Sequence, residues 1–155
     1  MHVDFRIQRV MEKIIKRSVT LGSIGYFPAP GTLGTFVTLP CVYALSYMPL
    51  LLQAVAIIIF CWYAYRAIAI SLPSFDSNDP SEIIIDECAG TLITFFGLSL
   101  SPLIMVSGFV LFRVFDIFKP FGIKWCERLP GAWGVLVDDC VAGCAAHLIL
   151  RMLFV

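Results

Sequence analysis

The sequence has few charged residues, which make up only 14% of its 155 positions. Soluble domains usually carry about 25%. The 11 basic residues are balanced by 11 acidic ones, so there is no basic excess to bind nucleic acid. With 59% hydrophobic residues, the chain is also too apolar for a disordered, fibrous or ordinary soluble protein. We therefore expect a single small integral membrane domain over residues 1–155.

Histidine is nearly absent, and the cysteines form no recognised motif. The two histidines, His2 and His147, are too few for a histidine phosphatase or a histidine-based metal site, and His147 is expected to pack or hydrogen bond within a helix. None of the six cysteines forms a C-x-x-C pair or a zinc-like spacing. The sequence also lacks a G-x-x-x-x-G-K-[ST] loop, which excludes nucleotide triphosphate hydrolysis of the P-loop type.

The positions of the charges predict an all-α membrane bundle. Residues 18–65 and 88–112 carry no charge, and both stretches exceed the roughly 20 apolar residues that span a bilayer. Residues 22–35, rich in glycine, proline and hydroxyl side chains, are predicted to form a loop. We expect about five to six helices, one of them amphipathic and N-terminal. The others are predicted near residues 34–47, 50–70, 82–97, 101–118 and 133–152.

The first 17 residues predict a basic amphipathic helix suited to an anionic membrane surface. Its apolar residues recur at helical spacing, with basic residues on the opposite side; they are Val3, Ile7, Val10, Met11, Ile14 and Ile15. The basic residues are Arg6, Arg9, Lys13, Lys16 and Arg17. This cluster also favours a cytoplasmic N-terminus under the positive-inside rule.

Two acidic doublets, Asp86-Glu87 and Asp138-Asp139, each precede an apolar run that begins with small residues. Small residues allow two helices in a membrane to approach closely, so we expect the doublets to meet. Four adjacent carboxylates cannot all remain ionised without compensation, and carboxylate oxygens suit a hard cation such as Mg²⁺. The alternative is that each doublet only complements the macrodipole at a helix start.

Further polar residues indicate phosphate chemistry on a membrane-held substrate. Arg113, Asp116 and Lys119 lie at the end of an apolar helix, on one side of its circumference. Arginine offers a planar fork that fits phosphate, and lysine a point charge, although an Arg–Asp pair at this spacing can be purely structural. The backbone and side chain around Gly31, Thr32 and Gly34 could complete an anion cradle.

These segments resemble the phosphatidylglycerophosphatase A family of bacterial membrane lipid phosphatases. The resemblance runs from about Gly22 to Gly143. The segments that carry it are 30–35 (PGTLGT), Asp79 with 83–90 (IIIDECAG), 112–120 (FRVFDIFKP), and Gly131 and Gly134 with 138–143 (DDCVAG). Each is weakly specific alone, but their order and spacing together are distinctive.

The resemblance implies Mg²⁺-dependent hydrolysis of the terminal phosphate of phosphatidylglycerophosphate, by an all-α protein of the inner membrane with a central helix packed among others. The mechanism we infer has Asp86, Glu87, Asp138 and Asp139 holding Mg²⁺, with Asp79 or Asp116 completing or orienting the shell. Arg113 and Lys119 would bind phosphate oxygens. Either a carboxylate orients the attacking water or a carboxylate attacks directly. The oligomeric state is left open.

Other classes of membrane protein fit parts of the pattern. A small transporter or channel could use the acids to relay protons or cations, but that reading favours acids near helix midpoints. A phosphatidyltransferase also uses Mg²⁺ and acids, but its long Asp-Gly…Ala-Arg…Gly…Asp…Asp pattern is not found here. A structural membrane subunit would leave the paired acids unexplained.

Overall fold

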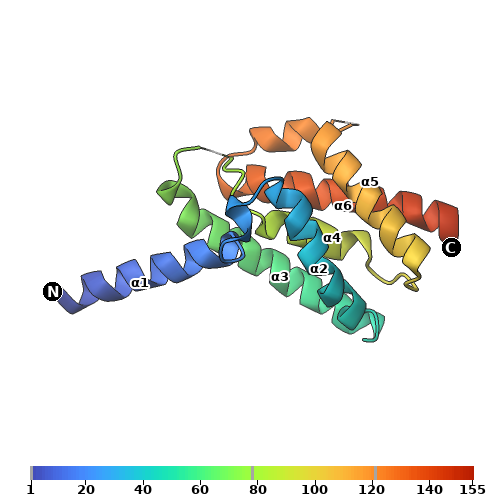
Figure 1. Cartoon of the computed structure of the whole chain (residues 1–155), viewed down its shortest axis with the longest axis horizontal. Coiled ribbons are helices and arrows are strands. Elements are labelled where there is room, and N and C mark those ends of the chain that lie inside the picture. The colour runs from blue at the N-terminus through green and yellow to red at the C-terminus, as the bar shows by residue number, and fades with distance from the viewer. Residues whose placement is uncertain (1, 78, 121) are drawn as a thin grey trace.

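The computed structural model describes residues 2–77, 79–120 and 122–155, with side chains from residue 9 onward except those of 78, 121 and 127. Within these ranges the protein is all-α and contains no strand, as the sequence predicts (Figure 1). The helices are α1 (His2–Val19), α2 (Pro30–Leu45), α3 (Leu50–Ser71), α4 (Ile85–Thr94), α5 (Pro102–Phe118) and α6 (Ala132–Phe154). Short 3₁₀ helices cover Ile24–Tyr26, Leu72–Ser74 and Ile123–Arg128.

The prediction of a loop over residues 22–35 is wrong in its second half, because α2 already begins at Pro30. Proline suits the first position of a helix, since its fixed φ is helical and its missing N–H would have no partner there. Ala29, with φ of 54°, turns the chain into the helix. The hydroxyls of Thr35 and Thr38 donate to the carbonyls of Gly31 and Gly34, so they are satisfied within α2.

Two helices are long and apolar enough to cross a bilayer. One candidate span covers Leu50–Ser74 and includes α3; only 28% of its most apolar window is buried within the protein. The other is α6, which is 50% buried. Large apolar side chains of α3 such as Leu51, Ile58 and Trp62 are exposed. An exposed apolar surface of this kind marks an interaction site, here with lipid.

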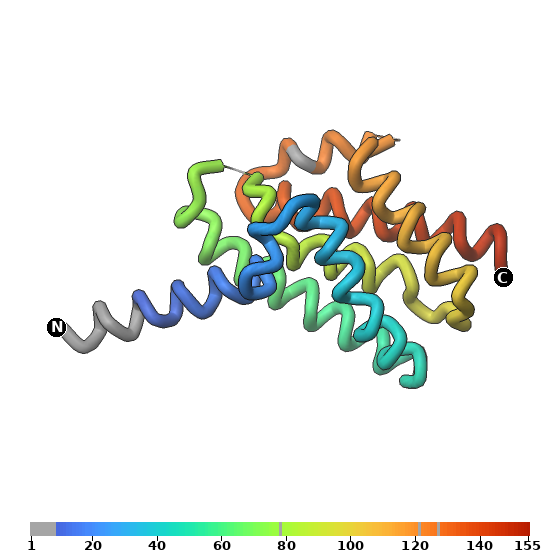
Figure 2. The backbone as a smooth tube through the Cα atoms, in the orientation of Figure 1, coloured from blue at the N-terminus to red at the C-terminus, as the bar shows by residue number. Residues whose placement is uncertain are grey.

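The short helix α4 occupies the centre of the bundle, where it packs against α2, α3, α5 and α6 (Figure 2). This confirms the central helix that the family resemblance implies. Its approach to α6 is closest at two glycines: a Cβ atom added at Gly143 would lie 2.3 Å from the carbonyl oxygen of Gly90. Side chains at either position would therefore separate the two helices.

Side chains from two longer helices bind the C-terminal end of α4 and the turn that follows it. Gln53 of α3 accepts a hydrogen bond from the backbone N–H of Gly97 at 3.0 Å. His147 of α6 places Nδ1 3.2 Å from the carbonyl oxygen of Thr94. The expectation that His147 forms a hydrogen bond within the fold is thus confirmed.

The N-terminal helix α1 joins the bundle only through its C-terminal part. Val19 is fully buried in a cluster with Ala64, Ala67 and Ile68 of α3, and Ile15 packs against the same cluster. Residues 9–14 of α1 extend away from the other helices (Figure 1). The predicted roles of Val3, Arg6 and Ile7 lie outside the described side chains.

Candidate functional site

Two elements bring three of the predicted acids together. Asp86 and Glu87 lie in the first turn of α4, and Asp139 faces them from α6. One carboxylate oxygen from each lies within 4.8 Å of the others. Asp138 is also buried, and it lies close enough to Asp86 for their charges to interact. The two doublets therefore converge, as predicted from the sequence.

The position of the second doublet differs from the prediction. We expected both doublets at helix starts, but α6 begins at Ala132, and Asp138 and Asp139 lie almost two turns inside it. The macrodipole acts mainly within the first turn of a helix, so it does not account for these two acids. The helix predicted over residues 133–152 already holds the doublet in its interior, because Gly134 is tolerated inside α6.

The carboxylates offer atoms suited to a cation. Four buried oxygens have no hydrogen-bond partner among the described residues: Oδ1 of Asp86, Oε2 of Glu87, Oδ1 of Asp138 and Oδ1 of Asp139. Buried polar atoms are nearly always paired, so four unpaired oxygens in one place make this cluster a candidate cation site. Oxygen-only donors of this kind fit Mg²⁺ or another hard divalent cation.

Burial also disfavours the charged forms of the acids in α4. Removal from water raises the pKa of Asp86 well above its usual range, and the adjacent charge of Glu87 adds to this shift. Burial likewise raises the pKa of Glu87 to about 7. A divalent cation between these groups would reverse the balance, because it favours the ionised carboxylates.

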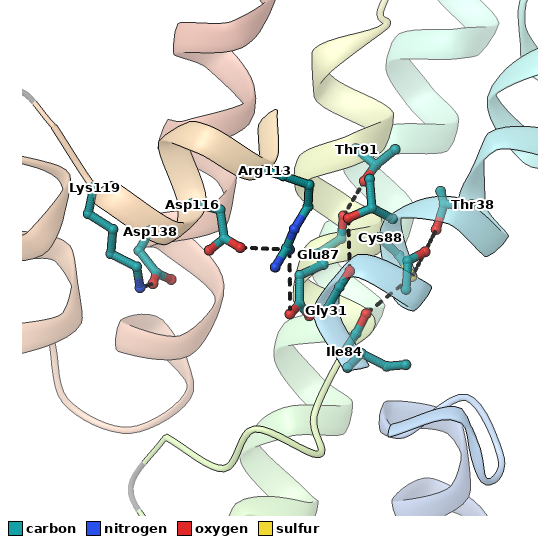
Figure 3. Close-up of polar contacts among 12 residues, drawn as sticks. Gly31, Thr38, Ile84, Glu87, Cys88, Thr91, Arg113, Asp116, Lys119 and Asp138 are labelled. Carbon is teal, nitrogen blue, oxygen red and sulfur yellow. Dashed lines mark hydrogen bonds and ion pairs between the residues drawn. The ribbon is translucent and has the colours of Figure 1, made fainter. Parts of the chain in front are cut away.

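Two cations border the acidic group, as the close-up in Figure 3 shows. Arg113 of α5 places Nη1 2.7 Å from Oδ2 of Asp116 and 4.0 Å from Oε1 of Glu87. Lys119, which ends α5, forms an ion pair with Oδ2 of Asp138. Both predicted phosphate-binding cations are thus beside the acids, and both contact carboxylates.

The glycines of the predicted anion cradle have different surroundings. A Cβ added at Gly31 would lie 2.2 Å from Oε1 of Glu87 and 2.9 Å from Nη1 of Arg113, so Gly31 borders the site. Thr32, the next residue of α2, is half-buried. Gly34 instead packs against Ile84, with the nearest side-chain atom 3.2 Å from its added Cβ. Of these two glycines, only Gly31 borders the charged groups.

Asp79 lies outside the cluster that the other acids form. It is an exposed residue of the loop before α4, near enough to Asp138 for their charges to interact. It lines a cavity of about 330 Å³ together with Gly134 and Arg128. Arg128 was not among the predicted site residues, although the sequence shows it as a basic residue in the short connector before α6.

The helix contact between Gly90 and Gly143 is the close approach that the small residues after each doublet predicted. Each glycine follows an acidic doublet within about one turn, so the close backbone approach sets how near Asp139 comes to Glu87. The sequence signal was the pair of small-residue runs after the doublets, which indicated close packing but not which atoms touch.

Fold and site together define a helical membrane protein with a buried acidic cluster bordered by arginine and lysine. Comparison with known proteins identifies the group. The family model of phosphatidylglycerophosphatase A matches residues 18–154. No solved structure matches the chain.

Curated relatives cover most of the chain. The phosphatidylglycerophosphatase A of Haemophilus influenzae is 31% identical over 140 residues, covering 86% of this chain and 83% of its own. The phosphatidylglycerophosphatase A of Escherichia coli is 30% identical over 116 residues, covering 74% and 67%. A Bacteroides thetaiotaomicron protein, provisionally named a phosphatidylinositol-3-phosphatase, is 30% identical over 136 residues, covering 83% and 86%.

This chain belongs to the phosphatidylglycerophosphatase A family. It is accordingly an enzyme, a phosphatase of phosphoric monoesters, and not a transporter or a structural subunit. Its two helices of membrane-spanning length agree with an enzyme of membrane lipids. The names of the relatives differ in the lipid headgroup, so family membership alone does not determine the substrate.

Proposed function

We propose that this enzyme hydrolyses the terminal phosphate of phosphatidylglycerophosphate in a Mg²⁺-dependent reaction of phospholipid biosynthesis. Water is consumed, the phosphate ester bond breaks, and phosphatidylglycerol and inorganic phosphate are released. Family membership supports the reaction class. The observation that carries the proposal is the set of four buried carboxylate oxygens without partners, beside Arg113 and Lys119.

In this proposal the acids of α4 and α6 hold the metal. Asp86, Glu87 and Asp139 supply the central ligands, and Asp138 adds an oxygen at the edge. Asp79 lies outside the cluster but near Asp138, so it suits a position outside the central metal ligands. When bound, Mg²⁺ neutralises charge that develops on the phosphoryl oxygens.

The cations and the remaining acid orient the phosphate. Arg113 presents its guanidinium toward the space between α2, α4 and α5, and Asp116 holds that side chain at 2.7 Å as a positioning residue. Lys119 carries a second positive charge to the edge where Asp138 lies. Gly31 leaves space that a larger residue would fill, and Thr32 follows it in the first turn of α2.

The membrane completes the proposed arrangement. We place α3 and α6 across a bacterial inner membrane as a multi-pass protein, with the site at the cytoplasmic face. The starts of α2 and α4 and the end of α5 all contribute to the site, so it lies at one end of the bundle. At that end the headgroup of a lipid can reach the acids while its acyl chains remain in the bilayer.

Phosphate release by the purified protein in detergent tests the metal ligands. We expect Asp86→Asn and Asp139→Asn to lose activity by at least 10²-fold, and a chelator to abolish it until Mg²⁺ is restored. Asp76→Asn is the matched control, because Asp76 is exposed and outside the cluster. Parental activity in both site variants, or full activity in chelator, would refute the proposed centre.

A panel of lipid phosphates tests the substrate. With phosphatidylglycerophosphate, phosphatidylinositol-3-phosphate and phosphatidate presented in the same micelles, we expect the highest kcat/KM for the first. A clear preference for either of the other two would overturn the proposed substrate while leaving the phosphatase chemistry intact. Absence of phosphate release from all three would contradict both.

A further inference from the structure

We infer that the base of α1 forms a binding pocket for the headgroup of an anionic phospholipid, separate from the acidic site. A cavity of about 500 Å³ lies there, lined by Lys13, Lys16, Arg17, Ser23 and Tyr26 among others. The described lining contains three cations and no carboxylate. The cavity therefore has the charge and the hydroxyl groups to bind a phosphate oxyanion.

One contact fixes the depth of this pocket relative to the bilayer. Nζ of Lys16 donates to the carbonyl oxygen of Ser74 at 3.1 Å and lies 4.1 Å from the ring centroid of Phe75. Ser74 is the last residue of the candidate span Leu50–Ser74. The cationic pocket thus adjoins the end of a membrane-spanning segment, where lipid headgroups lie.

The exposed apolar side of α1 agrees with the same partner. Val10 and Met11 are each 56% exposed and Ile14 is 62% exposed, on a part of the helix that extends away from the bundle (Figure 2). Helical geometry places these three side by side, next to the face that carries Arg9 and Lys13. Such a helix lies in the interface with its apolar side among acyl chains.

The basic residues do more than complement the dipole of α1. That effect reaches only the last turn, where Lys16 and Arg17 lie, and leaves Arg9 and Lys13 unexplained. Tyr26 and Phe27 follow α1 and are 59% and 58% exposed, as in aromatic belts at membrane interfaces. Asp76 and Glu82 line a smaller neighbouring cavity of about 190 Å³, and Lys16 and Tyr26 line both cavities.

Hydrogen exchange of the full-length protein in lipid nanodiscs tests this inference. We expect residues 9–19 to exchange more slowly in nanodiscs that contain phosphatidylglycerol than in nanodiscs of phosphatidylcholine alone. Each cation near an anionic surface strengthens the attraction roughly fivefold, so the triple variant K13Q/K16Q/R17Q should lose the difference. K124Q/R151Q, which removes two exposed basic residues elsewhere, should retain it.

Native mass spectrometry supplies a second readout, since it counts anionic lipids that stay bound to the protein released from each nanodisc. Added salt should reduce the protection of the unmodified protein, and this arm does not depend on whether the triple variant folds. Equal exchange in both nanodiscs, or unchanged protection in the triple variant, would overturn the inference. The inference would also be overturned if inorganic phosphate in detergent protected residues 9–19 from exchange equally well, or if the protection appeared only when the protein dimerises.

Discussion

Replacing Gly143 with alanine gives the most direct test of how the acidic site is assembled. The added Cβ would lie 2.3 Å from the carbonyl oxygen of Gly90, whereas ordinary contacts at a Cβ are 3.4–4 Å. The obstacle is backbone and not a flexible side chain, so α4 and α6 must separate by about 1 Å. Overpacking of this kind costs about 1–3 kcal/mol of stability.

The same separation should affect catalysis more strongly than folding. Asp139 lies one turn before Gly143 on α6, and Glu87 lies three residues before Gly90 on α4, so the shift acts directly on the distance between their carboxylates. A displacement of about 1 Å at a catalytic group can lower a rate by about 10²-fold. We therefore expect Gly143→Ala to remain folded, to lose about 10²-fold in phosphate release and to need more Mg²⁺ for half-maximal rate.

The assay is phosphate release across a Mg²⁺ titration, with the thermal transition of each protein measured in the same detergent. Cys144→Ala serves as the control, because the neighbouring Cys144 is exposed and its replacement adds no atoms. Parental activity and parental Mg²⁺ dependence in Gly143→Ala would refute the reasoning, since the helices could then move apart without effect. Equal losses in the control would show that any change in this turn is harmful.

Three further changes test the charged groups around the acids. Arg113→Lys keeps the charge but loses the planar fork of the guanidinium, so we expect kcat/KM for the lipid to fall by about 10–100-fold. An unchanged kcat/KM would show that the guanidinium does not bind the phosphate. Lys119→Met leaves the buried Asp138 without its partner, so the temperature of the thermal transition should fall. Adding Asp138→Asn should restore stability but not activity. A double variant as unstable as the single one would contradict the pairing. Gly31→Ala places a Cβ 2.2 Å from Oε1 of Glu87. We expect about 10²-fold less phosphate release from a protein of normal stability. Full activity would show that the carboxylate of Glu87 is free to move.

The long helices could be predicted from the sequence because hydrophobicity alone determines them. The uncharged stretch before Arg66 and the apolar run after Asp139 place α3 and α6 within a few residues of their observed ends. The start of α2 could not be predicted in this way. Proline, glycine and threonine usually favour loops, and the tertiary contacts of Gly31 and Gly34, which add to the preference of Pro30 for a first helical position, are not visible in the sequence.

The acidic site was predicted in composition but not in its internal pairing. The small residues after each doublet predicted that all four acids would meet, and Asp86, Glu87 and Asp139 form the group with ligand atoms closest together. Sequence could not show that Asp138 would face Lys119, since that depends on how α5 ends and on the left-handed conformation of Lys119. Neighbouring carboxylates on one helix point in directions about 100° apart, so members of a doublet take different partners.

The shortness of α4 has a consequence for how the protein enters the bilayer. Ten residues make a helix of about 15 Å, roughly half the thickness of the hydrocarbon layer. With the site at the membrane surface, as proposed above, the C-terminal end of α4 would stop at mid-depth, where water cannot solvate its polar groups. His147 places Nδ1 next to the carbonyl oxygen of Thr94 in place of solvent, and Gln53 accepts from the backbone N–H of Gly97 in the turn that follows. We therefore expect these two side chains to contribute to the insertion and stability of the protein, at the opposite end of α4 from the acidic cluster.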